Sequence, residues 1–166
     1  MFILSEPDTP SACSGVVHSR NFLFAWPRLI HAVRGETSNW CFGNGAGTTF
    51  NDDGTVSANT NGRLNTFEGC TTISDPAGDL LFYTDGITVY NQDHVVMENG
   101  NGLFGDSSST QSAIIIPKPD DPDIYYIFMG DTSIAENDVD RGLNYSEVDI
   151  SLNGGNGAIV QRIYHY

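Results

Sequence analysis

The sequence predicts an all-β fold, because turn-forming pairs are dense, helical periodicity is missing and a unit of strands is repeated. Asn-Gly and Asp-Gly pairs tolerate positive backbone φ angles and close tight hairpins. No stretch between these pairs keeps an apolar period of about 3.6 residues over three turns, which argues against helices. The pairs are Asn44-Gly45, Asp53-Gly54, Asn61-Gly62, Asp85-Gly86, Asn99-Gly100, Asn101-Gly102, Asn153-Gly154 and Asn156-Gly157.

Short runs rich in β-branched and aromatic residues lie between these turns and predict the strands. An acidic stretch, residues 131–141, separates the third strand of the second repeated unit from the strand before it. In chain order, strands are predicted over residues 40–42, 70–74, 80–84, 87–90, 95–97, 112–116, 124–129, 143–150 and 158–163.

The repeat defines the expected architecture. The strands over residues 70–74 and 80–84 are echoed by those over 112–116 and 124–129, with offsets of 42 and 44 residues. Periods of about 40 to 50 residues with several short strands per unit are typical of β-propeller blades. We therefore predict a partial β-propeller of about two antiparallel blades, blade one over about residues 68–108 and blade two over about 110–163. A β-sandwich is the structural alternative, since it uses short strands at similar spacing.

The first 35 residues differ from the rest of the chain. They hold three arginines against Glu6 and Asp8, whereas most of the acids follow later. Residues 22–33 have the length of a signal-peptide apolar region, but Pro27 and Arg28 interrupt it. We interpret residues 1–35 as a degraded leader or a disordered extension, and residues 36–166 as one propeller-like β domain that is incomplete at its C-terminal end.

Charge limits the classes of partner. The chain has 21 acidic and 7 basic residues and a formal net charge of −14. This charge repels phosphate backbones and anionic lipid headgroups, so nucleic acid is not an expected partner. No apolar run reaches the roughly 18 to 20 residues that cross a bilayer, so membrane insertion is not expected. Cations, neutral glycans and basic protein surfaces stay compatible with the composition.

Five ordered blocks carry a resemblance to a known family. They are residues 39–47 (NWCFGNGAG), 64–70 (LNTFEGC), 81–91 (LFYTDGITVYN), 108–115 (SSTQSAII) and 142–149 (GLNYSEVD). Together they resemble the N-terminal propeller-like region of secreted gliding-motility-associated bacterial surface proteins, which end in a type IX secretion sorting domain. The chain departs from this pattern at residues 1–34 and at residues 161–166, and Cys41 stands where an aromatic residue is usual. These departures suggest a truncated fragment of a longer parent chain.

The resemblance implies a secreted or cell-surface location and a non-catalytic binding or scaffold role, including adhesion related to gliding motility. Its partners would be a protein or a glycan at the cell surface, together with the rest of the parent chain. The alternative is a fragment of a propeller hydrolase that acts on polysaccharide, with its catalytic residues in missing blades. A third interpretation is a gene fragment without a function of its own, because two blades cannot close a ring.

We predict no catalytic residues, because the P-loop, H-E-x-x-H and G-x-S-x-G patterns are missing. His94 is expected to be a solvated turn residue. The binding surface is predicted at the loop end near Asp85, Tyr90 and Asn91. Packing between blades is the expected use of the strand aromatics, among them Tyr90, Tyr125, Tyr126 and Tyr145.

No metal site and no cofactor are predicted, but calcium is left open. Residues 51–54 (NDDG) begin like a calcium loop without its alternating ligands or terminal glutamate, so a plain hairpin is favoured. The acidic loop over residues 131–140 is a second candidate. A disulfide between Cys41 and Cys70 is also left open, because three cysteines do not define a disulfide scaffold.

Overall fold

The computed structural model describes residues 35–106, 108–131 and 142–164. Within them the chain is all-β, with eleven strands in sequence order and three single turns of 3-10 helix, η1 (Gly35–Thr37), η2 (Gly43–Gly45) and η3 (Leu152–Gly155). The predicted all-β class is therefore confirmed. No helix in the described part of the chain is long and apolar enough to cross a membrane.

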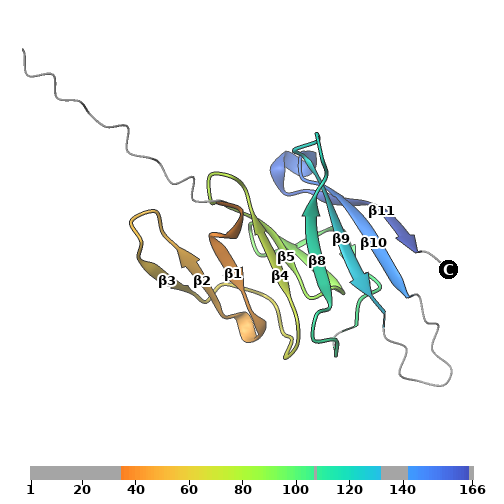
Figure 1. Ribbon diagram of the computed structural model, residues 1–166, viewed down its shortest axis with the longest axis horizontal. Coiled ribbons are helices and arrows are strands. Elements are labelled where there is room, and N and C mark those ends of the chain that lie inside the picture. Colours follow the sequence, from red (N-terminus) through yellow and green to blue (C-terminus); the bar gives the residue numbers. More distant parts are fainter. Residues whose placement is uncertain (1–34, 107, 132–141, 165–166) are drawn as a thin grey trace, which may run out of the picture. The chain divides into compact units, whose positions relative to one another are not determined.

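The strands form three consecutive antiparallel sheets, which we call sheets I, II and III (Figure 1). Sheet I contains β1 (Asn39–Cys41), β2 (Gly47–Phe50) and β3 (Val56–Asn59). Sheet II contains β4 (Thr71–Ser74), β5 (Leu80–Thr84), β6 (Thr88–Asn91) and β7 (Val96–Asn101). Sheet III contains β8 (Ala113–Pro117), β9 (Ile124–Gly130), β10 (Leu143–Asp149) and β11 (Ala158–Tyr164).

Each sheet is a meander in which neighbours in sequence pair with one another. Sheets II and III join into one eight-stranded sheet through a single parallel pairing, Glu98 with Ala158, between β7 and β11. The Arg162 side chain strengthens this junction by donating hydrogen bonds to the backbone carbonyls of Asn99, Asn101 and Gly102. At the other end β4 lies close to β8, so the eight-stranded sheet nearly closes on itself.

The main hydrophobic core fills the space between sheets II and III. Phe82 on β5 and Tyr125 on β9 meet edge to face, with ring centroids 5.6 Å apart. Alternation along β9 directs Tyr125, Ile127 and Met129 into this core. The buried members are Ile73, Phe82, Val89, Met97, Leu103, Ala113, Tyr125, Ile127, Met129, Val148 and Ile159.

Sheet I covers the opposite face of sheet II through a smaller core of Cys41, Leu64 and Tyr83. Polar contacts fix the seam between the first strands of the two sheets. The Asn39 side chain donates to Ser74 Oγ at 3.0 Å, and the Cys41 N–H donates to Thr72 Oγ1 at 2.9 Å. Sheet II is therefore covered on both faces.

Gly43 and Gly69 lie where two segments of backbone approach each other closely. A Cβ atom at Gly43 would lie 1.7 Å from the carbonyl oxygen of Thr66. A Cβ atom at Gly69 would lie 2.5 Å from the carbonyl oxygen of Thr110. The approach to β4 therefore packs against η2 on one side and against the approach to β8 on the other.

All nine predicted strands are present, with boundaries that differ by no more than a few residues. The sequence did not predict β2 and β3, so sheet I is an addition to the predicted architecture. Strand pairing also places the repeat differently, because Ile73 lies opposite Phe82 while Ile116 lies opposite Tyr126. Pairing requires the two offsets to total 87 residues, so the predicted offsets of 42 and 44 residues do not both hold. The interpretation of residues 1–34 lies outside the described residues.

Shortening Ile127 tests the core between sheets II and III. Ile127 is 0% exposed. We expect Ile127→Val to lower the free energy of unfolding by about 1 kcal/mol, because it removes one buried methylene group. Urea unfolding followed by circular dichroism measures the change. Val56→Ala, at a strand position 57% exposed, is the matched control and should change stability by less than about 0.5 kcal/mol. Equal losses for both variants would contradict the assigned core.

Candidate functional site

The predicted binding residues Asp85, Tyr90 and Asn91 do not form one loop end. Asp85 lies in the turn before β6, where its Oδ1 accepts the N–H groups of Ile87 and Thr88 at 2.9 and 2.8 Å. Asn91 ends β6 at the opposite side and is buried. Its Oδ1 accepts two backbone N–H groups of the next turn at 3.0 Å. Both side chains therefore hold hairpin turns, and a ligand role for them stays a prediction.

Tyr90 packs into the seam between sheets I and II. Its ring stacks on Tyr83 with centroids 5.4 Å apart and an interplanar angle of 17°. Burial raises the pKa of Tyr90, and the nearby Asp85 carboxylate raises it further. Tyr90 therefore packs between two sheets, although sheet I was not one of the predicted blades.

His94 occupies the turn between β6 and β7 with a positive φ of 59°. Its Nδ1 is 3.0 Å from the Tyr83 hydroxyl, which also accepts the Arg63 N–H at 3.1 Å. Burial raises the pKa of Tyr83 to about 12. His94 is therefore half-buried and bonded to a buried tyrosine, and the prediction of a solvated turn histidine is wrong in this respect.

The two described cysteines, Cys41 and Cys70, are free thiols. The Cys70 Sγ donates to the Cys41 carbonyl oxygen at 3.1 Å. Burial raises the pKa of both thiols. The disulfide that the sequence left open is not formed in this structure.

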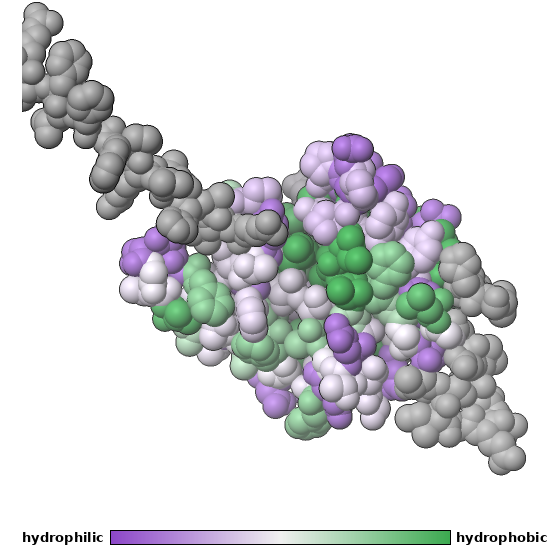
Figure 2. Space-filling model, in the orientation of Figure 1, coloured by the Kyte–Doolittle hydropathy of each residue, from purple (hydrophilic) through white to green (hydrophobic). Residues whose placement is uncertain are grey.

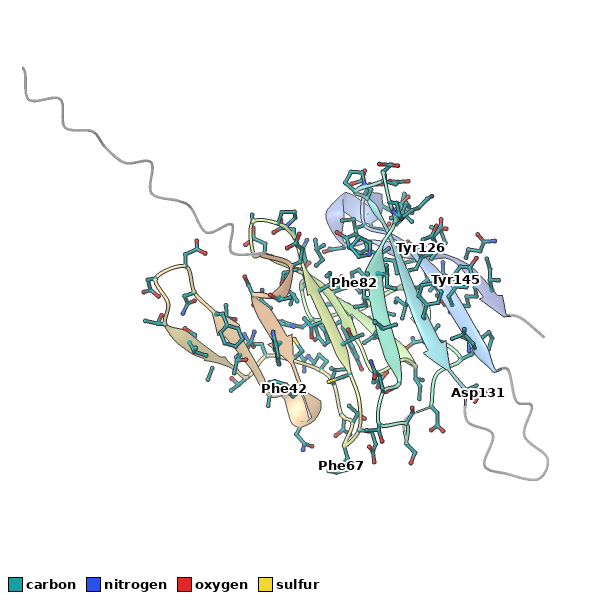
Figure 3. All side chains as sticks on the ribbon, in the orientation of Figure 1. Phe42, Phe67, Phe82, Tyr126, Asp131 and Tyr145 are labelled. Atoms are coloured by element: carbon teal, nitrogen blue, oxygen red, sulfur yellow. The ribbon has the colours of Figure 1, made fainter. Side chains whose placement is uncertain are left out.

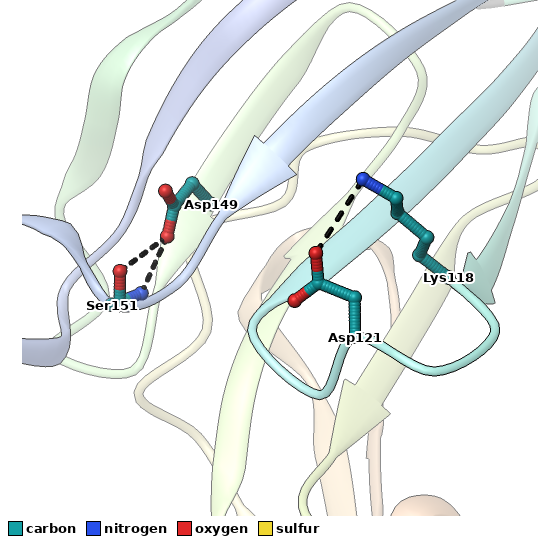
Figure 4. Close-up of polar contacts among 4 residues, drawn as sticks. All are labelled: Lys118, Asp121, Asp149 and Ser151. Atoms are coloured by element: carbon teal, nitrogen blue, oxygen red, sulfur yellow. Dashed lines mark hydrogen bonds and ion pairs between the residues drawn. The ribbon is translucent and has the colours of Figure 1, made fainter.

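The acidic turns use their carboxylates to close the chain. Asp53 Oδ1 accepts both the N–H and the hydroxyl of Thr55, as expected for a plain hairpin over residues 51–54. Lys118 forms an ion pair with Asp121 at 3.4 Å between β8 and β9 (Figure 4). Asp149 accepts the N–H and the hydroxyl of Ser151 after β10 (Figure 4). Calcium binding stays open, and most of the acidic loop over residues 131–140 lies outside the described residues.

A groove of about 420 Å³ runs between β1 and the segment that leads into β4. Trp40 and Phe42 border it and are 49% and 40% exposed. Trp40 also meets Phe50 edge to face, with ring centroids 5.9 Å apart, and donates its indole N–H to the Thr37 carbonyl at 3.0 Å. We call Trp40, Phe42, Phe50 and Val56 the open face of sheet I.

A larger exposed apolar surface lies on the side of sheet III that faces away from the core. Figure 2 shows hydrophobic side chains gathered over β8 and β9, and Figure 3 shows Tyr126 on β9 and Tyr145 on β10. Strand pairing aligns Ile114, Phe128, Tyr145 and Ile163 in one row across all four strands. Tyr126 meets Tyr145 edge to face at 5.7 Å. The open face of sheet III consists of Ile114, Ile116, Tyr126, Phe128, Leu143, Tyr145 and Ile163.

The exposure of these side chains is high for apolar residues. Ile114, Ile116 and Leu143 are 47%, 42% and 65% exposed. Contiguous apolar surface of this kind marks interaction sites on soluble proteins. The sequence analysis expected strand aromatics to pack between blades but did not identify an uncovered face. The signal was the continuous run of apolar residues along β8 and β9, which places apolar side chains on both faces of the sheet.

Comparison of the chain with protein-family models, with curated proteins and with solved structures gave no match.

Replacing Asp85 tests its turn-forming role. Asp85→Ala removes the acceptor of two backbone N–H groups, so we expect the free energy of unfolding to fall by about 1 to 2 kcal/mol. Asp85→Asn keeps Oδ1 as an acceptor and should lose less than about 0.5 kcal/mol. Chemical denaturation of the three proteins at pH 7 measures the difference. An alanine variant as stable as the parent chain would show that the carboxylate does not hold the turn.

Removing the Tyr83 hydroxyl tests the buried network. The folded chain holds the Tyr83 pKa at about 12, above the ordinary value of 10.0. The unfolded chain therefore releases this proton first, so the contribution is complete below pH 10 and is lost as the pH rises toward 12. We expect Tyr83→Phe to be less stable by about 1 to 2 kcal/mol at pH 8, because the Arg63 N–H loses its acceptor.

The stability of Tyr83→Phe should also fall less steeply between pH 10 and pH 11 than that of the parent chain. Urea titrations at both pH values measure this slope. Val56→Ala, at an exposed strand position without a titratable group, is the control and should retain the parent slope. A parallel decline for Tyr83→Phe and the parent chain would overturn the assignment.

Proposed function

We propose that this chain is a non-catalytic binding and scaffold module of a secreted or cell-surface protein, related to adhesion and gliding motility. In this proposal, sheets II and III are successive blade-like units of a partial propeller, and sheet I precedes them in the same stack. The module acts by seating protein surfaces against the ends of the stack.

The observation that carries the proposal is the open face of sheet III. Its exposed aliphatic and half-buried aromatic side chains extend across all four strands, while the same kind of surface on sheet II is buried. The same face carries two polar side chains, since Glu147 lies opposite Tyr126 and Gln161 lies opposite Glu147. Its most exposed apolar side chains, Ile114, Ile116 and Leu143, are aliphatic and suit a protein surface better than a sugar ring. A protein is therefore the favoured partner.

The acidic net charge argues against a polyanionic substrate and favours selective contacts. The formal net charge of −14 keeps separate molecules apart at low salt, so association depends on a surface with a good apolar fit. The family resemblance of the five sequence blocks supports the secreted or cell-surface location.

The proposal requires the open face to be accessible in the folded chain. We expect the full chain to bind an apolar fluorescent dye, anilinonaphthalene sulfonate, while it retains a β-type circular dichroism spectrum and a cooperative thermal transition. Ile114→Ser combined with Ile116→Ser should reduce the fluorescence by about half or more, because both side chains belong to the exposed face.

Leu152→Ser is the matched control, because Leu152 is 40% exposed in η3 and lies outside the open face. It should leave dye fluorescence within about a tenth of the parent value. A cooperative, folded chain that binds no dye would contradict the proposed function. Dye binding that the double variant leaves unchanged would do so as well.

A further inference from the structure

The open face of sheet III has a buried counterpart on sheet II. In sheet II, Ile73 lies opposite Phe82, and in sheet III, Ile116 lies opposite Tyr126. The same alignment relates the next pair, since Thr84 lies opposite Val89 and Phe128 lies opposite Tyr145. The two sheets also stack with the same strand order and direction, because β4 lies close to β8 and β7 pairs in parallel with β11. The face of sheet II that packs on sheet III therefore corresponds to the open face of sheet III.

Burial differs sharply between the two equivalent faces. Phe82 and Val89 are 0% exposed and Ile73 is 9% exposed, because sheet III covers them. Their equivalents are half-buried or exposed, and Ile116 is 42% exposed. The open face of sheet III is thus similar in composition to the face of sheet II that sheet III covers.

The open face of sheet I is the matching surface at the other end of the stack. Asn39 and Cys41 point from β1 toward sheet II, whereas Trp40 points the other way. Phe50 and Val56 are directly opposite each other on β2 and β3 and are 44% and 57% exposed. Within the described residues, no sheet covers this side of sheet I. The corresponding side of sheet II is covered by sheet I, and that of sheet III is covered by sheet II.

We propose that the open face of sheet I on one copy of this chain docks on the open face of sheet III of a second copy. This inference rests on the proposed function and continues the stacking seen within the chain, where sheet I covers sheet II and sheet II covers sheet III. The contact joins two different faces, so it is head-to-tail. Two copies of three sheets then complete a ring of six, which is within the range of about four to eight blades that propellers contain.

Charge gives this association a defined salt dependence. Each copy carries a formal net charge of −14, so the copies repel each other at long range. The Debye length falls from about 10 Å at 0.1 M salt to about 3 Å at 1 M salt, which screens this repulsion. Association through apolar faces should therefore tighten by at least about 10-fold between these conditions.

The experiment measures sedimentation velocity of the full chain from about 1 to 200 µM in 0.1 M and 1 M NaCl. We expect a reversible shift from monomer to dimer. Phe50→Glu on sheet I and Tyr126→Glu on sheet III should each weaken it at least about 100-fold, because each buries an unpaired carboxylate in the contact. Phe67→Glu is the matched control, since Phe67 is 91% exposed in the loop before β4, and should associate like the parent chain.

Mixing the two variants identifies the faces that meet. Phe50→Glu keeps the open face of sheet III, and Tyr126→Glu keeps the open face of sheet I, so an equimolar mixture should regain a dimer through one intact contact. Circular dichroism and thermal melts verify that both variants fold. A parent chain that stays monomeric at 200 µM in 1 M NaCl would overturn the inference, and so would a mixture that stays monomeric.

Two outcomes separate this inference from the proposed function. If Phe50→Glu still forms the parent dimer while Tyr126→Glu does not, sheet III pairs with itself and the head-to-tail contact is wrong, although the face is still a docking surface. If the parent chain is monomeric yet binds the apolar dye, the second copy is not the occupant and the proposed function stands. Loss of both association and dye binding would overturn both.

Discussion

Burial of both faces of sheet II is the constraint on which the rest of the fold depends. Adjacent residues on β5 point in opposite directions, and both Phe82 and Tyr83 are fully buried. One faces the core shared with sheet III, and the other faces sheet I. A strand that is apolar on both faces needs a layer on each side. The order of the three sheets along the chain supplies those layers.

Much of this fold could be predicted from local sequence. Asn-Gly and Asp-Gly turns and runs such as that of β9 specify hairpins through nearby residues, so nine strands were found. Strands β2 and β3 were missed because their sequences, GTTF and VSAN, are short and partly polar. They are strands because β1 pairs with β2 and the Asn39 side chain anchors β1 on sheet II. Pairing across a sheet also shows that the two offsets of the repeat total one residue more than predicted.

The candidate site could be predicted only in part, for a related reason. Asp85 and Asn91 have the polar chemistry expected of ligand contacts, but the same chemistry is what a tight turn requires. Their carboxylate and amide oxygens are already engaged by backbone N–H groups. The open face of sheet III consists of ordinary strand residues such as Ile114 and Phe128. Sequence shows that these residues are apolar, but which face finds a cover is decided by sheets far away in the chain.

The sequential order of the sheets also sets how the chain acquires its structure during synthesis. Strands pair with their neighbours in sequence, so each meander closes short loops at low entropic cost. Synthesis proceeds from the N-terminal side, so the residues of sheets I and II leave the ribosome before those of β8. Each finished sheet then serves as the template on which the next one assembles. During this process, the sheet that formed last exposes an apolar face until the next hairpins are synthesised.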